Sequence, residues 1–117
     1  MLKKENIVKK NWEFQKIIGS KKQYLSKHLI LYYLKNACFK IGISIPKKFA
    51  NAAKRNYLRR QIRAIIAQKA KILNLNYNVV LIIRKDFINL NFEEKKYYVY
   101  KIFSKLDNYV FKEDQKI

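Results

Sequence analysis

The most constraining feature of this sequence is a long segment without negative charge. Between Glu13 and Asp86 lie 72 residues that include 17 lysines and arginines and no carboxylate. Any fold of the chain must hold these cations at its surface, around a core built from apolar residues that make up 50% of the sequence. Such a surface repels itself, and a polyanion is its natural stabiliser.

The charge therefore narrows the class of partner. The formal net charge is +19, from 27 basic and 8 acidic residues. A protein that is basic merely for solubility mixes charges of both signs on its surface, and this segment does not. Nucleic acid is the leading expectation and an anionic membrane surface the weaker one. A membrane-bound helix would need to expose Leu or Phe beside its basic residues, whereas the apolar stripes here are needed to cover a sheet.

The length and the scarcity of breaking residues predict one domain. With 117 residues, two glycines and one proline, residues 1–117 leave no room for a linker, and we expect only 112–117 to fray. The single cysteine, Cys38, excludes a disulfide scaffold, fits a cytoplasmic protein and is expected to be a small buried hydrophobe. The longest apolar runs, 29–34 and 79–83, fall far short of the roughly 20 residues that span a bilayer.

The first half of the chain predicts a helix and two strands. Asn11 can cap a short helix that Gly19 ends. Residues 24–36 read as one strand that is apolar on both faces, with His28 inside it. Residues 39–45 alternate, so Phe39, Ile41, Ile43 and Ile45 are expected in the core, and Lys40, Gly42 and Ser44 on the other face. The short connection at 36–38 predicts that these two strands pair with each other as antiparallel neighbours.

The second half predicts a long helix, a strand and a last helix. The long helix runs from Ala52 to about Leu73 with Asn51 as its cap, and the strand covers 77–83. Asn91 and Glu94 match a capping box at the start of the last helix. The fold class is α+β, a single-domain α/β sandwich with a small mixed sheet and the order α-β-β-α-β-α. The expected apolar stripes are Leu58, Ile62, Ile65, Ile66 and Leu73 in the long helix, and Val99, Ile102, Phe103, Leu106 and Val110 in the last.

The most informative segment is the start of the long helix. Arg55, Arg59 and Arg63 follow one another at i, i+4 and i+8, where like charges destabilise an isolated helix. Lys54 and Arg55 also lie in the first turn, where the helix dipole disfavours cations. Folding gives no reason for this arrangement, but a phosphate backbone does, because arginine grips phosphate oxygens in pairs.

Residues 42–63, read with their flanks, closely resemble the signature of the bacterial ribonuclease P protein subunit. The family's RNR motif reads Arg55-Asn56-Tyr57 here, preceded by Pro46-Lys47-Lys48 and Asn51. Further likeness lies in Lys9-Lys10-Asn11 with Phe14 and in 82–85. The chain departs from the family pattern at Ile18, Pro46, Ala50 and Tyr57, where an aromatic residue, serine, glycine and arginine are more usual.

The resemblance implies a left-handed βαβ crossover and two RNA-binding surfaces. One binds the catalytic RNA of ribonuclease P, and the other is a cleft between the first helix and the sheet for the single-stranded 5′ leader of precursor tRNA. Aromatic faces stack on unpaired bases with little sequence preference, which suits varied leaders. The residues carried over are Lys47, Lys48, Asn51, Lys54, Arg55, Asn56, Arg59, Arg60 and Arg63 for the catalytic RNA, and Phe14, Ile18, Tyr32, Lys40 and Ser44 for the leader.

The sequence offers no constellation for protein-based hydrolysis. His28 is the only histidine, and the two adjacent acidic pairs, 93–94 and 113–114, are a helix cap and a tail. A nuclease needs clustered carboxylates or a paired acid and base. We therefore expect an accessory subunit of an endoribonuclease, with no catalytic residue and no metal site of its own and with Mg²⁺ bound mainly by the RNA. The alternative is a structural ribosomal-type protein that only binds rRNA.

Overall fold

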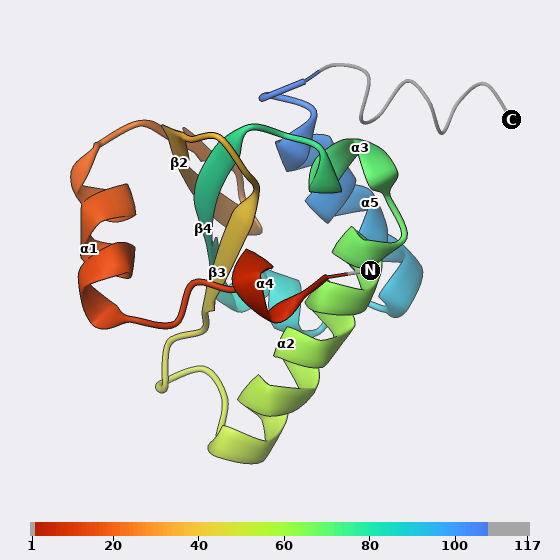
Figure 1. Ribbon diagram of the computed structural model, residues 1–117. Coiled ribbons are helices and arrows are strands. Elements are labelled where there is room, and N and C mark those ends of the chain that lie inside the picture. The colour runs from red at the N-terminus through yellow and green to blue at the C-terminus, as the bar shows by residue number, and fades with distance from the viewer. Residues whose placement is uncertain (1, 108–117) are drawn as a thin grey trace, which may run out of the picture.

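The structure is a computed structural model that describes residues 2–107 and places a four-stranded sheet between helices (Figure 1). Helix α1 covers one face of the sheet, and α2 and α5 cover the other. This is the predicted α+β sandwich. Its elements are η1 (Lys4–Asn6), α1 (Asn11–Gly19), β1 (Gln23–Leu25), β2 (Leu29–Lys35), β3 (Lys40–Ser44), α2 (Ala52–Ala67), α3 (Ala70–Leu73), β4 (Tyr77–Ile83), α4 (Lys85–Ile88) and α5 (Phe92–Phe103).

The strand order is β1-β2-β4-β3, so the prediction that β2 and β3 pair with each other is wrong. Strand β4 lies between them, antiparallel to β2 and parallel to β3. Val79, Val80 and Leu81 are fully buried, and a strand that is apolar on both faces is most stable in the middle of a sheet. The connection from β2 to β3 has to cross over β4, so it covers two strand spacings, about 10 Å. Four extended residues span that distance. Strands β3 and β4 are then joined by a crossover through α2 and α3.

The single strand predicted over 24–36 is two strands joined by a tight turn. The Ser26 hydroxyl accepts hydrogen bonds from the main-chain N–H groups of His28 (3.3 Å) and Leu29 (3.0 Å). This side-chain bonding offers the backbone an alternative to the extended ladder. His28 consequently lies in the turn and not inside a strand, as the sequence had suggested.

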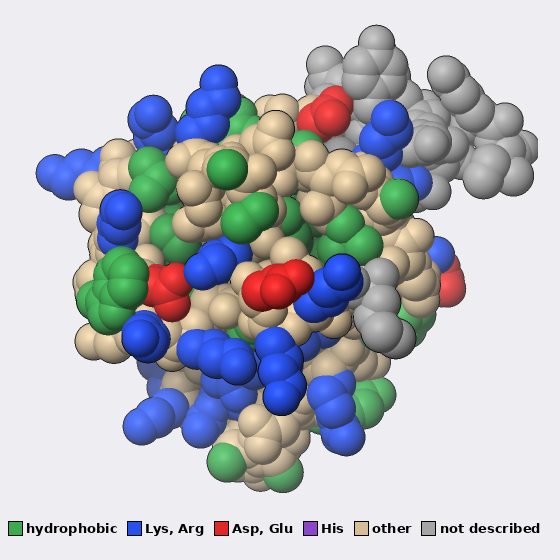
Figure 2. Space-filling view, in the orientation of Figure 1, with side chains coloured by type: hydrophobic (Ala, Val, Ile, Leu, Met, Phe, Trp, Pro, Cys, Tyr) green, Lys and Arg blue, Asp and Glu red, His purple; other side chains and the backbone are tan. Residues whose placement is uncertain are grey.

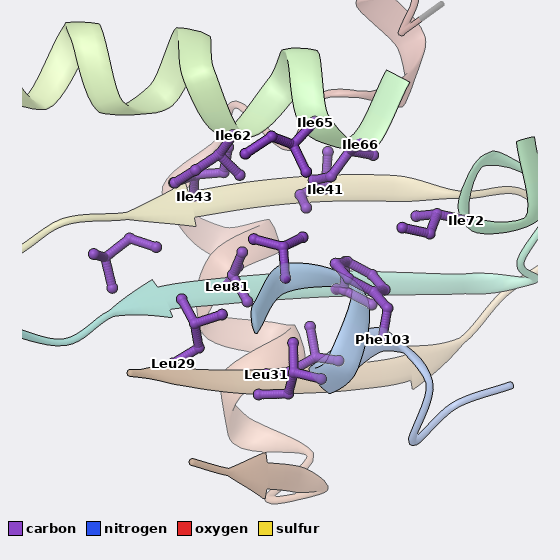
Figure 3. Packing of buried hydrophobic residues seen from close by; sticks show 14 of the residues in the cluster. Leu29, Leu31, Ile41, Ile43, Ile62, Ile65, Ile66, Ile72, Leu81 and Phe103 are labelled. Carbon is purple, nitrogen blue, oxygen red and sulfur yellow. The ribbon is translucent and has the colours of Figure 1, made fainter. Parts of the chain in front are cut away.

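The main core lies between the sheet and the helices α2 and α5 (Figure 3). The predicted alternation over residues 39–45, in β3 and directly beside it, is confirmed, because Phe39, Ile41, Ile43 and Ile45 are all buried in this core. The stripe of α2 is confirmed as well: Leu58, Ile62, Ile65 and Ile66 are fully buried. In α5, Val99, Ile102 and Phe103 are buried, Leu106 is half-buried beyond the helix end, and Val110 lies outside the described residues.

The long helix ends earlier than predicted. Helix α2 stops at Ala67, and a separate turn, α3, carries a buried Ile72 and a half-buried Leu73. The N–H of Lys69 bonds to the carbonyl of Ile66, and the carbonyl of Ile65 accepts the Tyr100 hydroxyl instead (2.7 Å). A contact between α2 and α5 therefore terminates the helix, and no local residue signal predicts it.

Several smaller expectations are corrected. Helix α1 has Lys10 as its N-cap instead of Asn11, and Glu13 accepts the main-chain N–H of Lys10. Gly19 ends α1 as predicted, and the left-handed conformation falls two residues later, at Lys21 (φ 61°). Cys38 is exposed and not buried, because the loop that passes β4 carries it to the surface. The predicted fraying of 112–117 lies outside the described residues. Within residues 2–107 no helix is long and apolar enough to cross a bilayer.

Candidate nucleic-acid interface

Helix α2 presents its predicted basic residues on the side away from the core. We call this set the basic face of α2; it comprises Lys54, Arg55, Asn56, Arg59, Arg60 and Arg63. Asn51 is the N-cap, as predicted, and its side chain accepts the main-chain N–H of Lys54 at 2.8 Å. The cap and the four buried residues of the apolar stripe fix the rotation of the helix, and this rotation turns the arginines outward.

Among the described residues 2–107, the hydrogen bonds donated by arginines of the basic face go to neutral groups. Arg55 Nη1 donates to the carbonyl of Ala50 (2.9 Å), and Arg59 Nη1 donates to Asn56 Oδ1 (3.2 Å). The Nε of Arg63 is buried and has no hydrogen-bond partner. The one ion pair found among residues 2–107 joins Lys40 and Glu13 and involves none of these arginines. An unpaired cluster of this kind has donors available for an anionic ligand.

The loop before α2 extends the same charge. Lys47 and Lys48 are exposed, and Lys48 Nζ lies 5.2 Å from the centre of the Phe49 ring. Figure 2 shows Lys and Arg side chains crowded over the lower half of this face, where α2 and the preceding loop lie in Figure 1. Ala50 has no positive φ, so this turn does not require the glycine that is more usual in the resembled family. Tyr57 is 46% exposed and its hydroxyl accepts a hydrogen bond from Gln61.

The predicted leader residues meet on the opposite face of the sheet. We call Phe14, Ile18, Tyr32, Lys40 and Ser44 the α1 site. Phe14, Ile18 and Tyr32 are half-buried and pack around Val8, Ile17 and Val80. The strand register places Tyr32, Val80 and Gly42 in one row across the sheet, and Ser44 with Ile82 and Ile30 in the next. The structure thus brings together residues from three separate segments, as the sequence analysis expected.

Lys40 of the α1 site and its neighbour Gly42 are more constrained than the sequence suggested. Lys40 Nζ lies 3.3 Å from Glu13 Oε2, so its charge is already partly neutralised. Burial raises the pKa of Glu13, but hydrogen bonds from Lys40 and from the Lys10 main chain, with the Lys40 charge, outweigh it and hold that pKa below 4.5. Gly42 lies directly beneath the Phe14 ring. The alternation that put Gly42 and Lys40 on one face could have signalled this contact.

A groove that the sequence analysis missed adjoins the α1 site. It measures about 410 Å³ and continues along the same face of the sheet past Ile30 and Ile82. Four cations and one acid line it, so it shares the positive charge of the neighbouring surfaces. The signal available in the sequence was the period-two placement of Ile30 and Ile82 with Tyr32 and Val80. The lining residues are Lys27, Ile30, Pro46, Lys48, Phe49, Ile82, Ile83, Arg84, Lys85 and Asp86.

The acidic, histidine and cysteine side chains form no metal-binding cluster in the part of the chain that the structure describes. No group of three or more His, Cys, Asp or Glu residues within 2–107 could hold a metal ion. His28 packs its ring against Tyr98, with ring centres 4.0 Å apart, and is remote in sequence from the acidic residues. The chemistry that this geometry supports is the binding of a polyanion.

Comparison with known proteins identifies the family. The family model described as Ribonuclease P matches residues 2–107. The ribonuclease P protein component of Mycoplasma mobile is 54% identical over 107 residues, which cover 92% of this chain and 95% of that protein. The corresponding component of Mycoplasmopsis pulmonis is 51% identical, and the match covers 92% of this chain and 96% of that protein.

Solved structures agree in fold. The RNase P protein of Staphylococcus aureus superposes with a TM-score of 0.79 at 24% identity, covering 87% of this chain and 95% of that chain. The RNase P protein of Thermotoga maritima superposes with a TM-score of 0.71 at 21% identity, and the match covers 79% of this chain and 89% of that chain. With the family model, the close relatives and the fold in agreement, the chain belongs to the ribonuclease P protein family.

Proposed function

We propose that this chain binds the catalytic RNA of ribonuclease P through the basic face of α2, and the 5′ leader of precursor tRNA through the α1 site. The observation that carries the first half is the absence of a carboxylate partner for any arginine of the basic face within residues 2–107. Four arginines held apart from acids on one helix are matched to a phosphate backbone, whose oxygens accept paired N–H donors.

The second half rests on the α1 site. Its two aromatic residues, Phe14 and Tyr32, are half-buried, so each ring is anchored on one side and open on another. Anchored rings lose little entropy when an unpaired base stacks on them, and such stacking contributes roughly 1–3 kcal/mol per base. The leaders of different precursors vary in sequence, and stacking tolerates that variation.

In this proposal the hydrolysis is performed by the RNA, with Mg²⁺ held mainly by RNA phosphates. The protein supplies positive charge that offsets phosphate repulsion in the assembled complex, and it positions the leader. The complex would work in the cytoplasm, where precursor tRNA is made. No residue of this chain is assigned a covalent or proton-transfer step.

The test is cleavage of a precursor tRNA at low Mg²⁺ with catalytic RNA alone, protein alone and both together. We expect efficient 5′ cleavage only in the combined reaction. Cleavage that is no faster with protein than with RNA alone would contradict the proposal and favour a structural rRNA-binding role. Cleavage by the protein alone would place the chemistry in this chain.

Variants separate the two surfaces. We expect Arg59→Ala and Arg63→Ala to weaken assembly with the catalytic RNA, each also lowering the salt dependence of binding by about one phosphate contact. Tyr32→Ala is expected to weaken binding of the precursor to the holoenzyme and to leave assembly nearly unchanged. If all three variants lose assembly to the same extent, the division into two surfaces is wrong.

A further inference from the structure

A second pocket opens between the β1–β2 turn and helix α5. Its volume is about 190 Å³, smaller than the clefts that hold drug-sized ligands and suited to a single nucleobase. It lies apart from the basic face of α2 and from the α1 site, with which it shares no residue. Its lining residues are Leu25, Ser26, Lys27, His28, Tyr98, Lys101, Ile102 and Lys105.

Two aromatic rings form one wall of this pocket. The rings of His28 and Tyr98 pack against each other in a tilted arrangement, with their centres 4.0 Å apart and their planes inclined by 31°. Tyr97 meets the Tyr98 ring edge-on, with ring centres 5.1 Å apart. Both His28 and Tyr98 remain half-exposed, so a flat ligand can extend the stack.

The turn that carries His28 is rigid. Arg84 Nη1 donates a hydrogen bond to the carbonyl of Ser26 (2.8 Å), and the Arg84 main-chain N–H donates to the carbonyl of His28 (3.0 Å). The Ser26 hydroxyl bonds within the same turn. A stacking wall held in this way loses little conformational freedom when a ligand binds.

The rim of the pocket is uniformly positive. Lys27, Lys101 and Lys105 are exposed, and no lining residue is acidic. Stacked rings surrounded by lysines are the combination with which proteins bind unpaired nucleic acid, since the rings hold a base and the lysines hold its flanking phosphates.

Lys27 connects this pocket to the surfaces already described. It lines both the pocket and the 410 Å³ groove, and that groove reaches Lys48 and Phe49 in the loop before α2. A band of cations therefore runs from the α2 loop, past Arg84 and Lys85, over Lys27 and on to α5. Because the band starts beside the basic face of α2, its continuous charge favours the RNA proposed for that face as the occupant.

From this continuity we propose that the pocket holds an unpaired nucleotide of the catalytic RNA, with the base stacked on the His28–Tyr98 wall and the flanking phosphates on Lys27, Lys101 and Lys105. The proposal rests on the proposed function, because it assumes that the catalytic RNA is the partner. It adds a third RNA contact on α5, a helix to which the sequence analysis assigned no functional residue.

The test is the affinity of the whole protein for ribonuclease P RNA as a function of salt. We expect Lys101→Ala with Lys105→Ala to raise Kd about tenfold at ~150 mM monovalent salt and to reduce the salt slope by about two phosphate contacts. The control removes the same charge at two exposed lysines outside these surfaces, Lys35→Ala with Lys71→Ala, and should change Kd less than about twofold.

A second pair of variants tests the stacking wall. Tyr98→Leu is expected to weaken RNA binding by about tenfold, while Tyr98→Phe, which keeps the ring, stays within about twofold of the native chain. Thermal melting of each variant shows whether the fold is retained. The Lys101 and Lys105 variants keep the test valid if Tyr98→Leu does not fold, since both side chains are exposed.

The outcomes are distinguishable. If Arg59→Ala weakens binding and the pocket variants match the Lys35/Lys71 control, the pocket proposal is overturned and the proposed function stands. If the pocket variants impair only binding of the precursor to the assembled holoenzyme, the occupant is the substrate and the assignment to the catalytic RNA is wrong. If neither Arg59→Ala nor the pocket variants weaken RNA binding, the proposed function itself fails.

Discussion

The ring of Phe14 lies on the main chain of Gly42. A Cβ atom at position 42 would stand 2.6 Å from Cε1 and 2.7 Å from Cζ of that ring, closer than such atoms approach in proteins. The Cβ atom of Val8 would lie 3.2 Å from the same Cβ atom at position 42. The absence of a side chain at this one position in β3 therefore allows α1 to dock on the sheet.

Gly42→Ala should displace Phe14 and disturb the α1 site. We expect a loss of about 1–3 kcal/mol in the free energy of unfolding, from overpacking, and weaker precursor binding with assembly on the catalytic RNA retained. Chemical denaturation and the two binding assays measure these effects. Gly19→Ala is the matched control: nothing lies within 4 Å of a Cβ there and its φ is not positive, so it should be neutral or slightly stabilising. Equal losses in both variants would contradict this account.

Glu13→Gln should increase affinity for RNA at the α1 site. Glu13 and Lys40 form an ion pair at 3.3 Å, and its loss releases the Lys40 ammonium and raises the net charge by one. We expect a few-fold gain in precursor affinity at low salt that shrinks as salt rises. The pair is partly solvated, so its loss should lower stability by no more than about 1 kcal/mol. Unchanged precursor affinity at every salt concentration would show that Lys40 does not face the leader.

The same pair predicts a pH effect on stability. The pKa of Glu13 is lowered in the folded state, so the unfolded chain binds its proton more tightly. Its stabilising contribution is therefore present above the unfolded value of 4.5 and is lost as pH falls through the lower folded pKa. Below pH 4.5 the stability of the native chain should drop toward that of Glu13→Gln, which lacks this titration; denaturation at a series of pH values checks it.

Lys95 is a buried cation whose titration should also make stability rise with pH, but in an alkaline range. It is 4% exposed, and its Nζ donates to Gln61 Oε1 at 2.7 Å between α5 and α2. Burial, with the nearby charge of Lys54, lowers its pKa from 10.5. Between the folded pKa and 10.5 the unfolded chain therefore binds more protons at Lys95 than the folded chain does. The free energy of unfolding rises as pH increases through this range.

Lys95→Met removes this titration. The free energy of unfolding of the variant, compared with that of the native chain, should be most favourable near neutral pH. This difference should shrink as pH approaches 10.5. The control is Lys71→Met, an exposed lysine whose stability difference from the native chain should stay flat over the same range. A flat difference for Lys95→Met as well would mean that Lys95 reaches solvent.

Tyr100→Phe should test the contact that ends α2. The Tyr100 hydroxyl donates to the Ile65 carbonyl at 2.7 Å in a buried setting. Removing it leaves that carbonyl without this donor, at a cost of about 1–3 kcal/mol. Denaturant unfolding measures the loss. Tyr98→Phe, in which a half-exposed tyrosine is changed in the same way, should cost clearly less, and equal costs would show that the buried bond has no special weight.

The sequence determined the features that depend on neighbouring residues. The basic face of α2 followed from a cap at Asn51 and an apolar stripe at helical spacing, and the burial of Phe39 to Ile45 followed from alternation. The capping box of Asn91 and Glu94 formed as predicted, with bonds of 2.9 and 3.1 Å. These features rest on interactions within one turn or one strand, so a short stretch of sequence contains their full cause.

Only the tertiary structure decided how these elements meet. Four contacts join residues that are far apart in the chain. They are the pairing of β4 with both β2 and β3, the hydrogen bond of Tyr100 to Ile65 near the end of α2, the docking of Phe14 on Gly42 and the packing of His28 against Tyr98. Strand pairing is chosen by the burial that the whole sheet achieves, and many registers satisfy the same local pattern. The sequence therefore indicated the residues that we propose to bind RNA, while the fold decided which of them share a surface.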